Sequence, residues 1–127
     1  SLRTYRELGA RAGAEALRGG AIVDATFRCR AHRDAFAAAY GDSAPKPQFI
    51  ECRAPAAVVA ERARRRELEP ARLSDATAEI AARQLTEFEP LDEVDPGRHV
   101  LVRTDRAPDA VVDAVEAALD ARLARGE

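Results

Sequence analysis

Hydrophobic residues near the start of the chain recur at a helical spacing. They are Leu2, Tyr5, Leu8, Ala12 and Ala16. This spacing places them on one face of an α-helix. Gly19 and Gly20 follow, and glycine commonly ends helices because it tolerates positive φ angles. The sequence therefore predicts a first helix that stops at these two glycines.

Three short hydrophobic runs are typical of strands. They cover residues 21–23, 48–52 and 99–103. The run at 21–23 is continuous rather than alternating, which suits a strand buried on both faces of a parallel sheet. We therefore predict three strands, the first of which ends at Asp24.

Helical patterns lie between and after these runs. They cover roughly residues 30–40 and 55–66, a stretch that Ser74 or Asp75 can cap, and the end of the chain from Pro108. Strands that alternate with helices imply right-handed crossovers and a parallel sheet. We predict an α/β fold, with a parallel sheet of about three strands and helices on both faces, in one partial domain over residues 1–127.

Charge and composition argue against some classes of binding partner. The formal net charge is -2 and only 5% of the residues are aromatic, which disfavours a nucleic-acid binder. No apolar run approaches the ~20 residues that span a bilayer, so we expect a cytoplasmic protein without a membrane partner. The histidines and cysteines have no metal-like spacing. The chain lacks methionine and opens inside a helical pattern, so we expect it to be part of a longer protein.

Polar side chains follow the predicted strands. Ligands of open parallel sheets bind beyond the carboxyl ends of the strands. Asp24 could hold Mg²⁺ through water there, or take a proton from an attacking hydroxyl; a cap on the following turn is an equal alternative. Arg28 could clamp a phosphate or a carboxylate, or be an ordinary surface arginine.

An arginine pair marks the third predicted helix. Arg62 and Arg66 are four residues apart and therefore share one helical face, beside a polar stretch at 67–73. Phosphoryl transfer develops negative charge over several oxygens, which mobile arginines can neutralise after closing over a nucleotide. We interpret residues 60–76, approximately, as such a lid. The alternative is a solvated basic face, because glutamates lie among the arginines.

An ordered set of segments resembles a known family. The set comprises Gly20-Ala21-Ile22-Val23-Asp24-Ala25-Thr26-Phe27, Arg33, Arg62-x-x-x-Arg66, Ser74-Asp75-Ala76 and Arg83-Gln84. In this order it is similar to the bacterial P-loop kinase-like ATPases of the AAA family, whose relatives include zeta toxins, polynucleotide kinases and gluconate kinases. The resemblance runs over essentially the whole chain. It implies a phosphotransferase that uses ATP and Mg²⁺ and phosphorylates a hydroxyl of a small molecule or nucleotide.

The resemblance also implies roles for single residues on the acceptor side. Asp24 matches the acidic residue at the strand tip, near Mg²⁺ or the acceptor hydroxyl. Thr26, Arg28 and Arg33 fall where such kinases contact the phosphoryl acceptor. These four residues are the implied catalytic and substrate-binding set around the first predicted strand.

Other residues would contact the donor, ATP. Arg62 and Arg66 match the lid arginines that grip the donor phosphates. Asp75 and Arg83 resemble the lid-to-helix pair that supports the phosphoryl group in nucleotide kinases. Thr104 falls where the loop after the last strand packs by the adenine.

The chain departs from the family at the phosphate-binding loop. The Walker A pattern G-x-x-x-x-G-K-[ST] is absent, and the only lysine, Lys46, lies in Ala-Pro-Lys-Pro. In the family this loop follows a strand between the first two predicted here, so a preceding segment or a swapped partner chain would have to supply both. We therefore expect the lid and acceptor-binding half of a kinase, inactive alone. The alternative is a non-catalytic α/β module used in assembly or regulation.

Overall fold

The structure is a computed structural model that describes residues 1–69 and 78–124. The chain divides into two units: Ser1–Pro47 with Phe88–Glu93, and Gln48–Glu87 with Val94–Glu127. Helices together with a small parallel sheet confirm the predicted α/β class. The prediction of one partial domain over residues 1–127 stays a prediction, and each unit is described by itself below.

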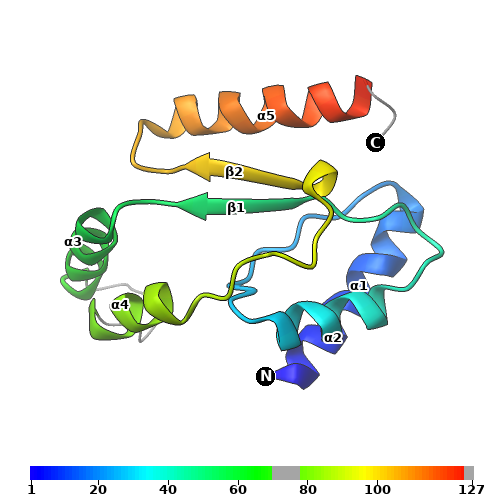
Figure 1. The fold of residues 1–127 in the computed structure, drawn as a ribbon, viewed down its shortest axis with the longest axis horizontal. Helices are drawn as coiled ribbons and strands as arrows, with labels where there is room; N and C mark the ends of the chain where they lie inside the picture. The colour runs from blue at the N-terminus through cyan, green and yellow to red at the C-terminus, as the bar shows by residue number, and fades with distance from the viewer. Residues whose placement is uncertain (70–77, 125–127) are drawn as a thin grey trace. The chain divides into compact units, whose positions relative to one another are not determined.

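Two helices form the framework of the first unit (Figure 1). α1 (Leu2–Arg18) ends at Gly19 and α2 (Arg30–Tyr40) ends at Gly41, and both glycines have positive φ angles. The predicted helix ends are therefore confirmed. The buried core of this unit consists of Tyr5, Ala12 and Phe36.

Gly9 of α1 lies against the backbone of α2, so a side chain there has no room. A Cβ added at Gly9 would overlap the carbonyl oxygen of Phe36, and one added at Gly13 would lie 2.6 Å from that of Tyr40. We expect Gly9→Ala to lower the free energy of unfolding by about 1–3 kcal/mol, the usual cost of overpacking. Urea unfolding followed by circular dichroism measures this change. The exposed neighbour provides the control, Ala10→Ser, and equal stabilities for the two variants would contradict the close contact of the helices.

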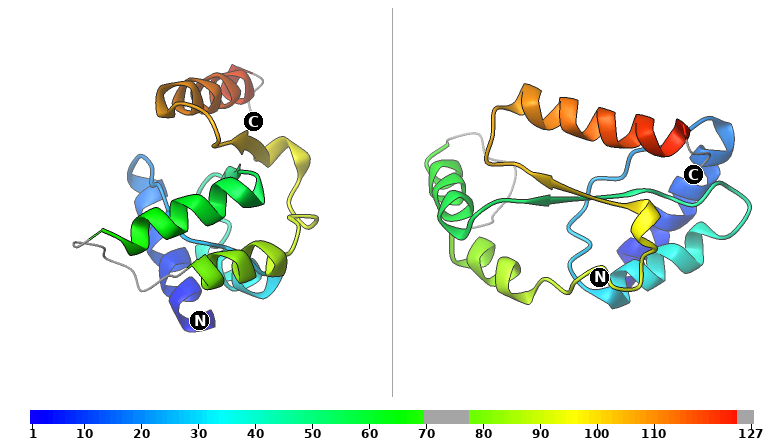
Figure 2. Two further views of the ribbon diagram at one scale, coloured as in Figure 1. Left: turned by 90° about the vertical axis from the view of Figure 1, so that its left-hand side faces the viewer. Right: turned by 45° about the horizontal axis from the view of Figure 1, so that its top comes forward.

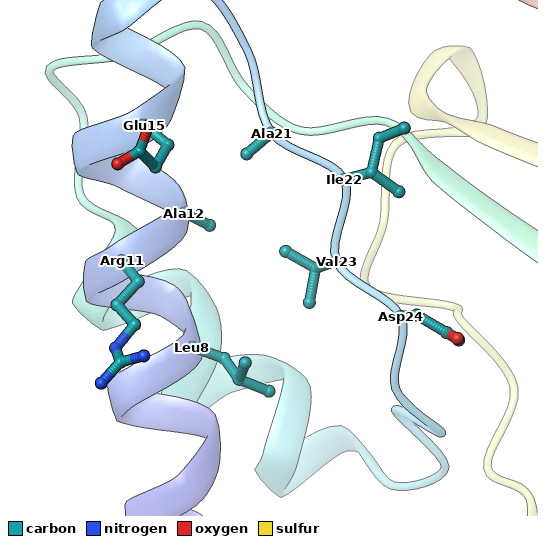
Figure 3. A pocket seen from close by; sticks show the side chains of 8 residues that line it. All are labelled: Leu8, Arg11, Ala12, Glu15, Ala21, Ile22, Val23 and Asp24. Atoms are coloured by element: carbon teal, nitrogen blue, oxygen red, sulfur yellow. The ribbon is translucent and has the colours of Figure 1, made fainter.

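The predicted first strand, residues 21–23, is not a strand. The chain between α1 and α2 is extended, but among the described residues of this unit no backbone hydrogen bond joins residues 21–26 to another segment. A strand needs a neighbour to pair with its N–H and C=O groups, and the unit offers none. Ile22 is fully exposed as a result. The side chains still alternate, since Val23 points toward α1 and Asp24 points away from it (Figure 3).

The second unit contains a sheet of two parallel strands instead of the predicted three. β1 (Phe49–Arg53) and β2 (His99–Arg103) pair from Phe49 opposite His99 to Arg53 opposite Arg103. Because the strands are parallel and in register, their carboxyl ends lie at the same edge of the sheet (Figure 1). The predicted runs at 48–52 and 99–103 are thus confirmed as strands, the first shifted by one residue.

Three helices and a short turn accompany this sheet. α3 (Ala56–Glu67) packs against α4 (Ala78–Glu87), and α5 (Pro108–Ala124) runs alongside β2 (Figure 2). The 3₁₀ turn η1 (Pro96–Arg98) leads into β2. Arg122 of α5 donates a hydrogen bond to the carbonyl oxygen of His99 at 2.8 Å and another to that of Gly97, which ties α5 to the start of β2. Among the described residues, no helix is long and apolar enough to cross a bilayer.

Candidate functional site

The carboxyl edge of the sheet holds one pair of predicted site residues. Arg62 of α3 donates to the hydroxyl oxygen of Thr104 at 3.3 Å and also to its carbonyl oxygen. Thr104 follows β2, and both its N–H (2.8 Å) and its hydroxyl (3.2 Å) donate to the carbonyl oxygen of Arg53 at the end of β1. The structure therefore brings together Arg62 and Thr104, which lie 42 positions apart in the sequence.

The arginines at this edge differ in their partners. Arg53 is paired with the buried Glu51, and Arg103 with Asp105 at 2.8 Å. Hydrogen bonds from Arg103 hold the pKa of Asp105 below its ordinary value of 3.8, so Asp105 is a carboxylate at neutral pH. Arg62, by contrast, donates to the uncharged oxygens of Thr104. No ion pair with an acid is formed by Arg62 among the described residues, so its positive charge at this edge is not neutralised.

The arginines of α3 also differ in whether an acidic side chain pairs with them. Glu61 is paired with Arg64 at 3.1 Å and with Arg65 at 3.9 Å. Arg62 and Arg66 are exposed and lie four residues apart, on one face of the helix, as predicted. Glu61 is thus paired with the two arginines of this stretch that are not predicted to grip the donor phosphates.

Part of the predicted lid is outside the described residues. This holds for Asp75 and for the rest of 70–77. Arg83 is described and lies exposed on α4, so its predicted partnership with Asp75 stays a prediction.

In the first unit, Asp24 and Thr26 lie on the extended segment between the helices. Asp24 is exposed, and its carboxylate points away from α1 (Figure 3). The hydroxyl of Thr26 lies 3.1 Å from that of Tyr5, which also accepts a hydrogen bond from the N–H of Phe27 at 3.0 Å. Tyr5 thus holds the side chain of Thr26 and the backbone of Phe27, two and three residues after Asp24.

Phe27 has a strained backbone. Its φ of 46° lies in the left-handed region, which bulky residues rarely adopt. Its ring packs edge-on against those of Tyr5 and Phe36, with centroids 5.0 and 5.1 Å apart. Such strain persists only where several contacts hold the backbone in place, and it is often found at functional sites. Here it lies between Thr26 and Arg28, two of the predicted acceptor-binding residues.

Arg33 is buried, with 2% relative exposure, and its guanidinium makes internal contacts. It donates to the carbonyl oxygens of Phe27 (2.7 Å) and Pro90 (3.0 Å) and forms an ion pair with Glu93. Burial alone would raise the pKa of Glu93, but the hydrogen bonds to its carboxylate and the positive charges of Arg33 and Arg30 together outweigh burial, and the pKa falls below its ordinary value of 4.5. The predicted contact of Arg33 with an acceptor stays a prediction.

A nearby histidine is also perturbed. The ring of His32 stacks on that of Tyr5 with centroids 4.5 Å apart. Burial, helped by the positive charges of the N-terminus and of Arg28, lowers the pKa of His32 from 6.5. The ring is therefore mainly neutral at physiological pH and serves packing rather than charge.

A pocket of about 230 Å³ lies between α1 and the extended segment (Figure 3). Leu8, Ala12 and Val23 give it mostly apolar walls, with Arg11 and Glu15 at the side of α1. Arg11 is already paired with Glu7 at 2.9 Å. The pocket therefore lacks the converging cations that a phosphate site needs.

The described residues contain no cluster of three His, Cys, Asp or Glu side chains that could hold a metal ion directly. Asp24 would hold Mg²⁺ through water only, which is one of the two roles predicted for it, and both roles stay predictions. The predicted site residues thus fall into two groups. Asp24, Thr26, Arg28 and Arg33 belong to the first unit, whereas Arg62, Arg66, Arg83 and Thr104 belong to the second.

Sequence reasoning missed several acidic and aromatic partners in these groups. Glu89 and Glu93 hold the loop around Phe27, Tyr5 supports Thr26, and Glu51 pairs with both Arg53 and His99. The only sign of these partners in the sequence is the acidic loop that follows α4, next to Phe88 and Pro90. Its partners lie about sixty positions away, so the local pattern does not identify them.

A comparison of the sequence with profiles of protein families gives one match. The profile described as an AAA domain matches residues 2–91, well over half of the chain. The chain belongs to the AAA domain family. This membership supports the resemblance to P-loop kinase-like proteins and indicates a kinase-like nucleotide-binding type of domain. No curated protein and no solved structure matches the chain significantly.

The match to the AAA domain includes all predicted site residues of the first unit, and those of the second unit except Thr104. It includes α1, α2, β1, α3 and α4, and therefore Asp24, Arg33 and Arg62. β2 and Thr104 lie beyond it. The contact between Arg62 and Thr104 is thus an observation that the match to the AAA domain does not itself provide.

Proposed function

We propose that this AAA domain chain is the lid and acceptor-binding half of an ATP-dependent phosphotransferase that acts on a hydroxyl of a small molecule or nucleotide. The observation that carries the proposal is the uncompensated guanidinium of Arg62 at the carboxyl edge of the sheet. An arginine that donates to neutral oxygens can exchange them for phosphate oxygens, because a phosphate carries the opposite charge and accepts two parallel hydrogen bonds from one guanidinium.

One group of residues would act on the phosphoryl donor and the other on the acceptor. Arg62 and Arg66 would neutralise charge on the donor phosphates. Asp24 would accept the proton of the attacking hydroxyl or hold a water in the Mg²⁺ shell, since its carboxylate is exposed. Thr26 and Arg28 would orient the acceptor beside it. Bound Mg²⁺ would withdraw charge from the phosphoryl oxygens.

Mg²⁺-ATP binding tests the proposal. The chain has guanidinium donors on α3 but no loop with the Walker A pattern, so we expect weak or no binding by these 127 residues alone. Isothermal titration of Mg²⁺-ATP into the chain and into the full-length protein that contains it gives the comparison. Binding by the full-length protein only is the expected result. Absence of binding by both would reject the kinase half in favour of a non-catalytic module.

Arg62 should matter for turnover and little for folding. Arg62→Ala in the full-length protein removes one charge-assisted contact, worth about 1.5–3 kcal/mol, so turnover of Mg²⁺-ATP should fall roughly 10- to 100-fold. Steady-state ATP consumption measures this change. Arg64→Ala is the matched control on the same helix, because Arg64 is exposed and paired with Glu61. Equal turnover in the two variants would remove Arg62 from the site.

A further inference from the structure

Residues Phe88–Glu93, here called the strap, belong to the first unit, although the preceding helix α4 belongs to the second. The N–H of Glu89 donates to the carbonyl oxygen of Arg28 at 2.7 Å. The carboxylate of Glu89 accepts a hydrogen bond from the N–H of Arg30 at 2.7 Å. This carboxylate caps α2 in place of Cys29, whose side chain makes no cap bond. Glu89 therefore fastens the strap to the loop before α2.

Arg33 makes the second set of contacts between the strap and the loop before α2. Its guanidinium joins the carbonyl oxygen of Phe27 in the loop to the carbonyl oxygen of Pro90 in the strap, at 2.7 and 3.0 Å. The ion pair with Glu93 holds the far end of the strap, and the guanidinium also lies 6.0 Å from the ring centre of Phe88. One planar group with five donors thus binds both segments at once, which a lysine ammonium has neither the reach nor the geometry to do.

The loop that Arg33 holds is the strained one. Phe27, at a φ of 46°, lies directly between Thr26 and Arg28. A bulky residue keeps such a conformation only if its surroundings impose it. Tyr5 binds the N–H of Phe27 on one side, and Arg33 binds its carbonyl oxygen on the other. The direction of the neighbouring side chains therefore depends on these two contacts.

We propose that Arg33 is a positioning residue. By clamping the strap to the loop at Phe27 it holds Thr26 and Arg28 in the orientation that receives the acceptor hydroxyl, and it does not itself touch substrate. This inference rests on the proposed function, because Thr26 and Arg28 are acceptor residues only if the chain is half of a phosphotransferase.

Amide hydrogen exchange in the 127-residue chain tests the clamp. Arg33→Lys keeps a positive charge opposite Glu93 but does not bridge the two carbonyl oxygens. We expect exchange at the amides of Arg30 and Glu89 to become about tenfold faster or more, with the amides of Val100 and Val102 in β2 unchanged. If Arg33→Lys does not fold, Glu93→Gln, which keeps the shape and removes only the charge, gives the same readout. Unchanged exchange at Arg30 and Glu89 would overturn the clamp.

Kinetics of the full-length protein test the positioning. With ATP as donor and water as acceptor, Arg33→Lys should lower kcat about tenfold and leave KM for ATP within about twofold, because orientation of the attacking oxygen is lost and donor binding is kept. An unchanged kcat, or a matching rise in KM, would overturn the positioning role. A wild-type protein that binds no Mg²⁺-ATP would overturn the proposed function and this role with it. The exchange experiment would still decide whether the clamp exists.

Discussion

Replacing Arg33 with methionine should lower the free energy of unfolding by about 3–5 kcal/mol, the usual cost of breaking a buried ion pair from one side. The side chains of Arg33 and Glu93 are only 2% and 13% exposed, so the variant leaves a carboxylate without its cation in a largely dry site. It also leaves the carbonyl oxygens of Phe27 and Pro90 without their donor. Urea unfolding monitored by circular dichroism measures the loss.

A matched control lies one turn earlier on the same helix. Arg30 is 62% exposed and is paired with Asp34 at 3.6 Å. Such exposed pairs contribute little, so Arg30→Met should change stability by less than about 1 kcal/mol. The hydrogen bond from Arg30 to Glu89 uses the backbone N–H and survives the substitution. A loss in Arg33→Met no larger than that in Arg30→Met would contradict the buried ion pair.

The ion pair should also give a pH signature. The pKa of Glu93 in the folded chain lies below its ordinary value of 4.5, because the hydrogen bonds to its carboxylate and the charges of Arg33 and Arg30 together outweigh the effect of burial. A carboxyl with a lowered folded pKa adds stability that is complete above the ordinary pKa and disappears as the pH falls through the folded one. The stability difference between wild type and Arg33→Met should therefore shrink below about pH 4.5. A difference that stays constant into that range would show that the charge of Glu93 is not responsible.

Element boundaries could be predicted from the sequence where a residue ends the element by its own geometry. Gly41 closes α2 at the predicted place, and Pro108 opens α5 as predicted. The reason is local: glycine reaches positive φ at low cost, and proline has no N–H to leave unpaired in the first turn of a helix. Such signals need no information about the rest of the chain.

The run at 21–23 shows where local patterns fail. Its hydrophobic residues are typical of a buried strand, and its side chains alternate in the structure as they would in one. It still forms no strand, because pairing requires a second backbone and the first unit provides none within the described residues. The sequence predicts the conformation of this segment but not its partner.

The same limit applies to the candidate site. Arg62 and Thr104 could each be predicted near the carboxyl edge, because each follows a strand in a parallel sheet. Burial of Arg33 could not be predicted, because it depends on Pro90 and Glu93, 57 and 60 positions further along the chain. An arginine four residues into a helix looks the same in sequence whether it faces solvent or a distant carboxylate.

Asp24→Asn should produce the largest loss of activity. If Asp24 takes the proton of the acceptor, or holds a water in the Mg²⁺ shell, the amide can do neither with comparable strength. Turnover of Mg²⁺-ATP by the full-length protein should then fall by about 10²–10⁴-fold, the usual contribution of a general base. Folding should be unaffected because the carboxylate is exposed and points away from α1. Steady-state ATP consumption and urea unfolding, measured on the same variant, separate the two effects.

Asp42→Asn is the matched control for this substitution. Asp42 is also exposed and lies in the first unit, just after α2, so its loss should leave turnover near that of wild type. Near-normal turnover in Asp24→Asn would exclude both roles of Asp24. Magnesium dependence then distinguishes the roles in an impaired variant. A weakened metal shell should be partly restored by raising the Mg²⁺ concentration, whereas a missing base should not, because added Mg²⁺ accepts no proton from the attacking hydroxyl.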